Sequence, residues 1–187
     1  MPPGLIAFNA AIAGCERAGH WETAVKLLLG LRQDGLRPDE ITYNAALSAC
    51  EKRGRWERAF VMVTELVARS LEPDALTGNA AVSACGRSAR WEWSSELLCE
   101  NRRRGVMLGV VGFNAAISSC ESGVQWAWSL GLLADMHGGR LAPDMISCNA
   151  AISACEKAEQ WEWALEMFGA MQAVHVELDV ISYSAAI

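Results

Sequence analysis

The tripeptide Asn44-Ala45-Ala46 decides the fold, because it recurs along the whole chain at one fixed interval. Its five copies lie 35 residues apart and begin at Asn9, Asn44, Asn79, Asn114 and Asn149. Two further residue types keep the same interval, namely Cys15, Cys50, Cys85, Cys120 and Cys155, and Trp21, Trp56, Trp91, Trp126 and Trp161. Three residue types in one register over five copies indicate an internal repeat of 35 residues.

Each repeat is predicted to form a pair of helices. In the second copy, residues 41–50 are apolar on nearly all sides, which is typical of a helix buried on most of its faces. A polar turn follows, in which Gly54 is the expected helix-ending residue. A second segment with helical spacing of apolar residues runs from Trp56 to Ala68, and Pro73 lies beyond it, where proline is tolerated.

A single 35-residue hairpin cannot cover its own apolar faces, so neighbouring hairpins must stack on a shared core. The predicted fold class is all-α, an α-solenoid in which stacked helical hairpins form a right-handed superhelix with a concave groove. The expected divisions are a lead-in at 1–4, repeats at 5–39, 40–74, 75–109, 110–144 and 145–179, and the start of a truncated sixth repeat at 180–187. Because no capping sequence follows, we expect a fragment of a longer array.

The charge balance limits the kind of partner. Lys+Arg 16 against Asp+Glu 22 gives a net charge of −6, which argues against a generally basic nucleic-acid coat. The acidic excess is concentrated in the fifth repeat, so a local basic path remains open. No apolar run approaches the roughly 20 residues that span a bilayer, so no membrane partner is expected.

Composition and motifs give little support for catalysis. The histidines His20, His137 and His175 occupy unrelated repeat positions, and no phosphate-binding loop, nucleophile motif or zinc-hydrolase motif is present. The seven cysteines lack metal-ligand spacing, so they are interpreted as buried packing residues rather than a metal or redox array. The sequence therefore predicts no enzyme activity, no cofactor, no metal site and no small-molecule substrate.

The period of 35 and the stretch Pro38-Asp39-Glu40-Ile41-Thr42-Tyr43-Asn44 resemble the pentatricopeptide repeat family, in its uniform P-type form. Tetratricopeptide repeats, with a period of 34, fit less well. The recurrent tryptophan is a departure from the family pattern. The resemblance implies binding of single-stranded RNA, one base per repeat, and a role in organelle RNA processing, stability, editing or translation. It also implies a mitochondrial or plastid location, although no transit peptide is visible. Any protein partners are expected to bind through the rest of a longer chain.

The resemblance also implies which residues contact RNA. Each base is read by the repeated asparagine and the last residue of its repeat, giving the pairs Asn9 with Asp39, Asn44 with Asp74, Asn79 with Gly109, Asn114 with Asp144, and Asn149 with Asp179. Aliphatic residues near the helix start sandwich the bases, namely Ile6, Ile41, Leu76, Val111, Ile146 and Ile181. Basic residues after the first helices hold phosphates, namely Arg17, Lys52, Arg87 and Lys157, and Ser122 replaces them in the fourth repeat.

In this family Asn with Asp favours uracil, so the expected target is U-rich and reads U-U-Y-U-U. The third base is a pyrimidine of either kind, because Gly109 has no side chain to contribute.

Several residues have a structural alternative. The aspartates that precede first helices could act as N-caps, and the asparagines could form a hydrogen-bonded ladder between repeats. The repeated tryptophans are interpreted as hairpin packing, and no function is assigned to the extra Trp93, Trp128 and Trp163. The alternative function is a helical-repeat scaffold that binds protein. The coupled Asn and Asp periodicity favours RNA, since a peptide scaffold has no reason to repeat the same pair.

Overall fold

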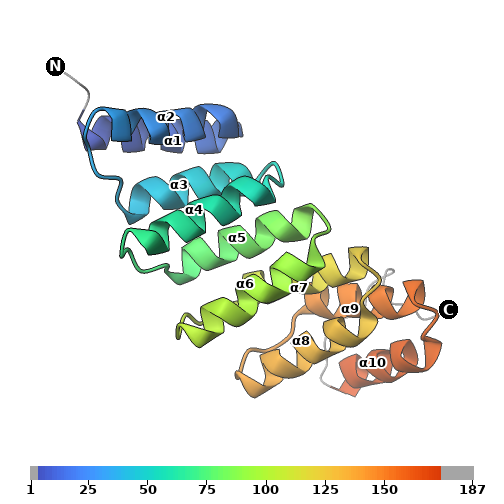
Figure 1. The fold of residues 1–187 in the computed structure, drawn as a ribbon. Coiled ribbons are helices and arrows are strands. Elements are labelled where there is room, and N and C mark those ends of the chain that lie inside the picture. The colour runs from blue at the N-terminus through green and yellow to red at the C-terminus, as the bar shows by residue number, and fades with distance from the viewer. Residues whose placement is uncertain (1–3, 174–187) are drawn as a thin grey trace.

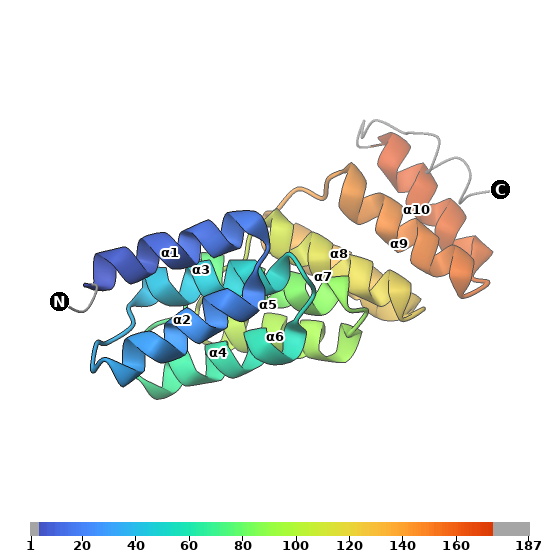
Figure 2. The ribbon, with the colours of Figure 1, turned by 90° about the horizontal axis from the view of Figure 1, so that it is seen from above.

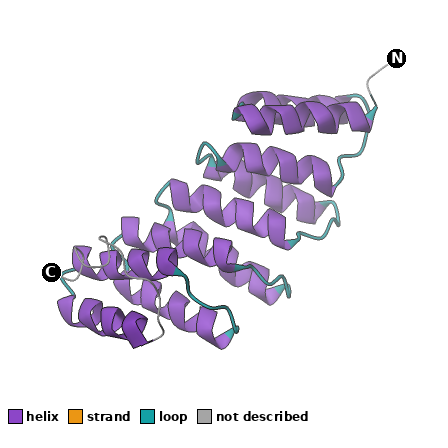
Figure 3. Ribbon diagram, turned by 180° about the vertical axis from the view of Figure 1, so that it is seen from behind, coloured by secondary structure: helices purple, strands orange, loops and turns teal. Residues whose placement is uncertain are grey.

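The computed structural model describes residues 4–173, and side chains as far as residue 169. Within this range the chain forms helices joined by short loops and no strand, which confirms the predicted all-α helical-repeat fold (Figures 1 and 3). The ten helices are α1 (Leu5–Ala18), α2 (Trp21–Gln33), α3 (Glu40–Glu51), α4 (Trp56–Ala68), α5 (Ala75–Arg87), α6 (Trp91–Arg103), α7 (Val110–Ser122), α8 (Trp126–Gly138), α9 (Met145–Lys157) and α10 (Trp161–Ala173). None of them is long and apolar enough to cross a lipid bilayer.

The helix limits follow local capping chemistry. Helix α4 has the predicted bounds, whereas α3 is one residue longer at each end than residues 41–50. It begins at Glu40 because the Asp39 carboxylate caps it, accepting a hydrogen bond from the Thr42 amide at 2.9 Å. The predicted helix-ending role of Gly54 is confirmed. Gly54 lies just beyond the last helical residues in the left-handed conformation with φ 60, its amide donates to the Glu51 carbonyl at 2.9 Å, and the Arg55 amide donates to the Cys50 carbonyl at 2.9 Å.

This left-handed turn occurs between the helices of every repeat. Its position is held by Gly19, Gly54, Ala89, Val124 and Glu159, all with positive φ. For a residue other than glycine this conformation costs about 1–2 kcal/mol. Ala89, Val124 and Glu159 adopt it nevertheless, because the turn brings the second helix of each repeat back against the first.

The hairpins stack in two layers (Figure 2). The first helices of the repeats, α1, α3, α5, α7 and α9, form a continuous row in which each packs on the next. Each second helix packs on its own first helix and, as far as α8, on the first helix of the following repeat. In the described part of the chain, successive second helices pack on one another far less closely than successive first helices do, so the row of first helices is the tighter layer and forms the inner face.

Small residues allow the close packing of the first helices. Ala46, Ala81, Ala116 and Ala151 have no exposed surface, and neither do Cys50, Cys85, Cys120 and Cys155. The cysteines are free thiols, and burial raises the pKa of Cys85 to about 12. They are therefore inert packing residues at neutral pH.

The outer layer is linked by aromatic contacts. The rings of Trp56 and Trp93 stack with centroids 5.8 Å apart, and those of Trp126 and Trp163 lie 6.0 Å apart. The Arg55 guanidinium lies 4.9 Å from the centre of the Trp21 ring. Two of the extra tryptophans therefore join neighbouring second helices.

Candidate functional site

A row of exposed aliphatic side chains follows the inner face. The second residue of every first helix is large, apolar and open to solvent: Ile6 is 86% exposed, Ile41 66%, Leu76 61%, Val111 63% and Ile146 59%. A folded chain usually buries such residues. Five of them in register form an exposed apolar row along one face of the array.

The predicted asparagine and aspartate pairs come together across the boundary between neighbouring repeats. Asn9 Nδ2 donates to the two carboxylate oxygens of Asp39 at 3.3 and 3.5 Å, and Asn44 Nδ2 to those of Asp74 at 3.4 Å each. The corresponding distances from Asn114 Nδ2 to Asp144 are 3.0 and 2.9 Å. The described ladder therefore joins asparagine to aspartate rather than asparagine to asparagine in these three pairs.

The same aspartates cap the next first helix. The carboxylates of Asp39, Asp74 and Asp144, here called the capping aspartates, accept hydrogen bonds from the backbone amides of Thr42, Thr77 and Ser147. Partial burial acts to raise the pKa of each carboxyl, but these hydrogen bonds, together with those from the side chains of the asparagine and the hydroxyl residue, outweigh it and hold the pKa below its usual value. Each capping aspartate is thus ionised at neutral pH and serves as both cap and asparagine partner.

The third pair is different. Gly109 stands at the N-cap of α7 and supplies no side-chain hydrogen bond. The Oδ1 atom of Asn79 is buried without a hydrogen-bond partner. The predicted partners Asp179 and Ile181, and the expected sixth repeat at 180–187, lie outside the described residues.

Sequence reasoning missed the hydroxyl that completes the first two pairs. The third residue of the following first helix lies between the asparagine and the aspartate. Thr42 Oγ1 is 2.6 Å from both Asn9 Oδ1 and Asp39 Oδ1, and Thr77 Oγ1 is 2.6 Å from Asn44 Oδ1 and 2.8 Å from Asp74 Oδ1, so the two oxygens share the single hydroxyl proton. The sequence does contain a sign of this contact, because the position recurs every 35 residues and carries a hydroxyl in three of four copies: Thr42, Thr77, Gly112 and Ser147. Its partner lies 33 residues away, so only the stacking of repeats brings the two together.

Two clefts on the inner face combine these elements. One of about 270 Å³ lies between α3 and α5, with Ile41, Leu76 and Asn44 in its walls. The other, of about 410 Å³, lies between α7 and α9 and is lined by Ile146 and Asn149. Each cleft places an amide beside exposed aliphatic groups, which is an environment for a flat ring with a polar edge.

The four predicted phosphate-contacting residues are exposed, but two of them are already paired. Lys52 Nζ donates to the Glu16 carbonyl oxygen at 3.0 Å, and Lys157 Nζ lies 2.8 Å from Glu121 Oε1. The glutamates form a row of their own, which the sequence analysis did not identify, at Glu16, Glu51, Glu121 and Glu156. Burial raises the pKa of Glu51 in this row. The predicted phosphate-contacting residues therefore lie directly beside a row of glutamate side chains.

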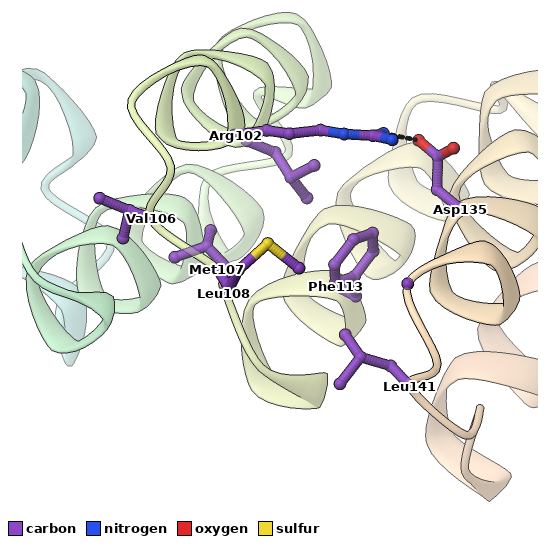
Figure 4. Close-up of a pocket in the computed structure, with 9 residues that line it drawn as sticks. Arg102, Val106, Met107, Leu108, Phe113, Asp135 and Leu141 are labelled. Atoms are coloured by element: carbon purple, nitrogen blue, oxygen red, sulfur yellow. Dashed lines mark hydrogen bonds and ion pairs between the residues drawn. The ribbon is translucent and has the colours of Figure 1, made fainter.

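A different pocket lies on the side of the second helices, between α6, α7 and α8 (Figure 4). Its volume is about 60 Å³, and Met107, Phe113 and Leu141 face one another across it. An ion pair between Arg102 and Asp135, 3.2 Å long, crosses its edge. In the described part of the chain, no group of three or more His, Cys, Asp or Glu side chains could hold a metal ion.

Family models match most of the chain. The model described as PPR repeat family matches residues 3–52 and 38–87, and the one described as pentatricopeptide repeat domain matches residues 131–187. The chain belongs to the pentatricopeptide repeat family. The resemblance stated from the sequence is thus confirmed. Among curated proteins, no match to the chain is found.

Solved pentatricopeptide repeat structures share the fold. The crystal structure of PPR10 from maize superposes with a TM-score of 0.73 at 23% identity, covering 100% of this chain and 27% of that one. The PPR domain of Arabidopsis thaliana protein-only RNase P 1, in complex with tRNA, gives 0.81 at 12% identity, covering 94% and 92%. Nuclear proteinaceous RNase P 2 from A. thaliana gives 0.86 at 8% identity, covering 96% and 40%. The chain spans about a quarter of the length of PPR10.

Proposed function

We propose that this chain is a sequence-specific module for single-stranded RNA that binds one base per repeat on its inner face. The observation that carries the proposal is the row of exposed aliphatic residues, each three positions before an asparagine on the same helix. An aliphatic side chain on each side of a base covers its flat faces, and the amide meets its edge. Unstacked single-stranded bases present both surfaces.

The hydrogen-bonding groups favour uracil. In the second repeat, one N–H of Asn44 Nδ2 faces Asp74, which leaves the other to donate to a base. The Asp74 carboxylate beside it accepts. Uracil offers the complement, a carbonyl acceptor at O4 next to the N3–H donor, whereas cytosine reverses both groups. The pairs therefore support the target U-U-Y-U-U from 5′ to 3′, with Asn149 and Asp179 assigned to the last base.

The phosphate backbone would contact Arg17, Lys52, Arg87 and Lys157. Four such contacts on a single strand give a slope of about −3 for the logarithm of affinity against the logarithm of salt concentration. The neighbouring glutamates and the net charge of −6 keep the affinity of these five repeats modest.

Two of the similar proteins support this assignment through their ligands. PPR10 has been solved in complex with an 18-nt psaJ RNA element, and the PPR domain of the protein-only RNase P 1 with tRNA. By family membership, the module would act in RNA processing, stability, editing or translation in a mitochondrion or plastid. No catalytic role is proposed for its residues.

Binding to matched oligonucleotides tests the proposal. We expect the chain to bind an RNA with a central U-U-C-U-U in preference to an A-rich RNA of equal length, with affinity falling as salt rises. Equal affinity for both, or binding to neither, would overturn the proposal and favour a protein-binding scaffold.

A pair of variants locates the site. Ile41→Ser removes an exposed aliphatic from the inner face, and Val61→Ser removes one that is 54% exposed on the outer helix α4. We expect the first to weaken binding about tenfold, because a base covers the side chain, and the second to leave it unchanged. Equal effects of the two variants would place the RNA elsewhere.

A further inference from the structure

We infer that the third residue of each first helix sets how strictly the preceding repeat distinguishes uracil from cytosine. This residue, here called the hydroxyl position, is Thr42, Thr77, Gly112 or Ser147 in successive repeats. The inference rests on the proposed RNA-binding function and assigns a positioning role to residues that lie beneath the bases rather than against them.

In the first two repeats a threonine hydroxyl holds the asparagine amide from one side. Thr77 Oγ1 lies 2.6 Å from Asn44 Oδ1, while Asn44 Nδ2 faces the Asp74 carboxylate on the other side. Turning the amide over would set its oxygen against that carboxylate and remove the nearer of the two acceptors of the Thr77 hydroxyl, the other being Asp74 Oδ1 at 2.8 Å. Thr77 is 1% exposed, so water cannot replace its hydroxyl.

The orientation of the amide decides which pyrimidine it can pair with. With Oδ1 held by threonine, the asparagine offers the base an N–H, which suits the O4 carbonyl of uracil. With the amide turned over, it offers an oxygen, which suits the N4 amino group of cytosine. A hydroxyl that fixes the amide therefore selects uracil without contacting it.

The third repeat lacks both groups that would fix the amide. Gly109 supplies no carboxylate and Gly112 no hydroxyl, and Asn79 Oδ1 is buried without a partner. This oxygen occupies the space of the missing side chain, because a Cβ atom at Gly112 would lie only 2.5 Å from it. Neither orientation of the Asn79 amide is selected by a neighbouring hydrogen bond.

The fourth repeat has one of the two groups. Asn114 Nδ2 keeps its aspartate at 2.9 Å, but the Ser147 hydroxyl donates to the backbone carbonyl of Asp144 at 2.8 Å. Asn114 Oδ1 is consequently buried without a partner. Serine lacks the methyl group that restricts the rotamer of threonine, so its hydroxyl is free to make this local bond. Discrimination between U and C should decrease from bases one and two, to base four, to base three.

The variant Thr77→Val tests this order, because valine keeps the shape of threonine and removes only the hydroxyl. Affinities are measured for RNAs with U or C at base two and, separately, at base one. We expect the U-over-C ratio at base two to fall about fivefold, in line with the loss of one hydrogen bond, and the ratio at base one to stay unchanged. The matched control is Thr64→Val, whose hydroxyl bonds to the Val61 carbonyl within the outer helix α4.

The complementary variant Ser147→Thr should raise the U-over-C ratio at base four, and it tests the inference even if the valine variant fails to fold. An unchanged ratio at base two in Thr77→Val, or an equal loss at every base, would overturn the inference. An unmodified chain with no preference for uracil at any base would instead overturn the proposed function.

Discussion

The substitution Gly109→Asp should stabilise the chain by giving α7 the N-cap that the other described first helices from α3 onward possess. Gly109 has φ −79 and ψ −174, close to the extended conformation of Asp39, with φ −100 and ψ 178. A Cβ atom at Gly109 would meet nothing within 4 Å. The new side chain can therefore enter without strain and reach the backbone amides in the first turn of α7, as the capping aspartates do in α3, α5 and α9.

Three contributions set the size of the effect. Replacing glycine reduces the entropy of the unfolded chain, worth about 0.4–1 kcal/mol. The capping hydrogen bond adds a few tenths of a kcal/mol over glycine. A negative charge at the helix N-terminus adds about 0.3–1 kcal/mol. The expected gain is about 1–2 kcal/mol, which raises the melting temperature of a chain of this length by about 3–6 °C.

Urea unfolding at pH 7 and pH 3 measures this gain. The new carboxyl, like the capping aspartates, should have a pKa below its unfolded value, so its charge contributes above the unfolded pKa of about 3.9 and is lost as pH falls through the folded pKa. Gly109→Asn is the matched control, because it caps without a titrating charge. An unchanged midpoint at pH 7, or an aspartate gain as large at pH 3 as at pH 7, would refute the reasoning.

Three other perturbations have defined outcomes. Gly35→Ala should lower the free energy of unfolding by about 1 kcal/mol in a thermal melt, because Gly35 has φ 74 and the strain arises from the backbone alone, with no atom within 4 Å of the new Cβ. Gly30→Ala inside α2 should raise the free energy of unfolding by a similar amount. Acid titration of the unmodified chain should show the free energy of unfolding falling below about pH 4, as the capping aspartates lose the charge that their hydrogen bonds favour; a flat profile from pH 5 to 2 would contradict this. Glu121→Gln should tighten RNA binding at low salt, because it removes the carboxylate that competes with phosphate for Lys157, while Glu96→Gln on the outer helix α6 should leave binding unchanged.

The period of 35 residues is sufficient to predict the all-α fold and the pair of helices in each repeat. Helix α4 has the bounds predicted from its apolar spacing, whereas α3 begins one residue earlier because Asp39 caps it and also extends one residue further, to Glu51. The helix-ending role of Gly54 was predicted correctly, because a glycine that allows positive φ closes the helix with hydrogen bonds back to Cys50 and Glu51. Periodicity locates a turn but not the residue at which hydrogen bonding stops.

The site could be predicted only in part. The pairing of Asn44 with Asp74 followed from family membership, yet the hydroxyl of Thr77 and the glutamate that pairs with Lys52 were missed. Those contacts join residues 33 and 36 positions apart, and nothing in a local pattern says which side chains meet across two stacked helices. The N-cap alternative is confirmed for three aspartates, and the base-contacting assignment stays a prediction that is compatible with it, because one carboxylate has enough acceptor sites for both.

The two layers of the array differ in what holds them together, and this gives the chain a mechanical asymmetry. The inner row is a stiff spine of fully buried alanine and cysteine, whereas the outer helices are joined by stacked rings and ion pairs such as Trp56 on Trp93 and Arg102 with Asp135. We therefore expect the outer contacts to separate first when the array is stretched, because the Arg102 and Asp135 side chains are exposed and their ion pair contributes little. The inner row loses its packing only if the repeats themselves come apart, since its alanine and cysteine side chains are fully buried.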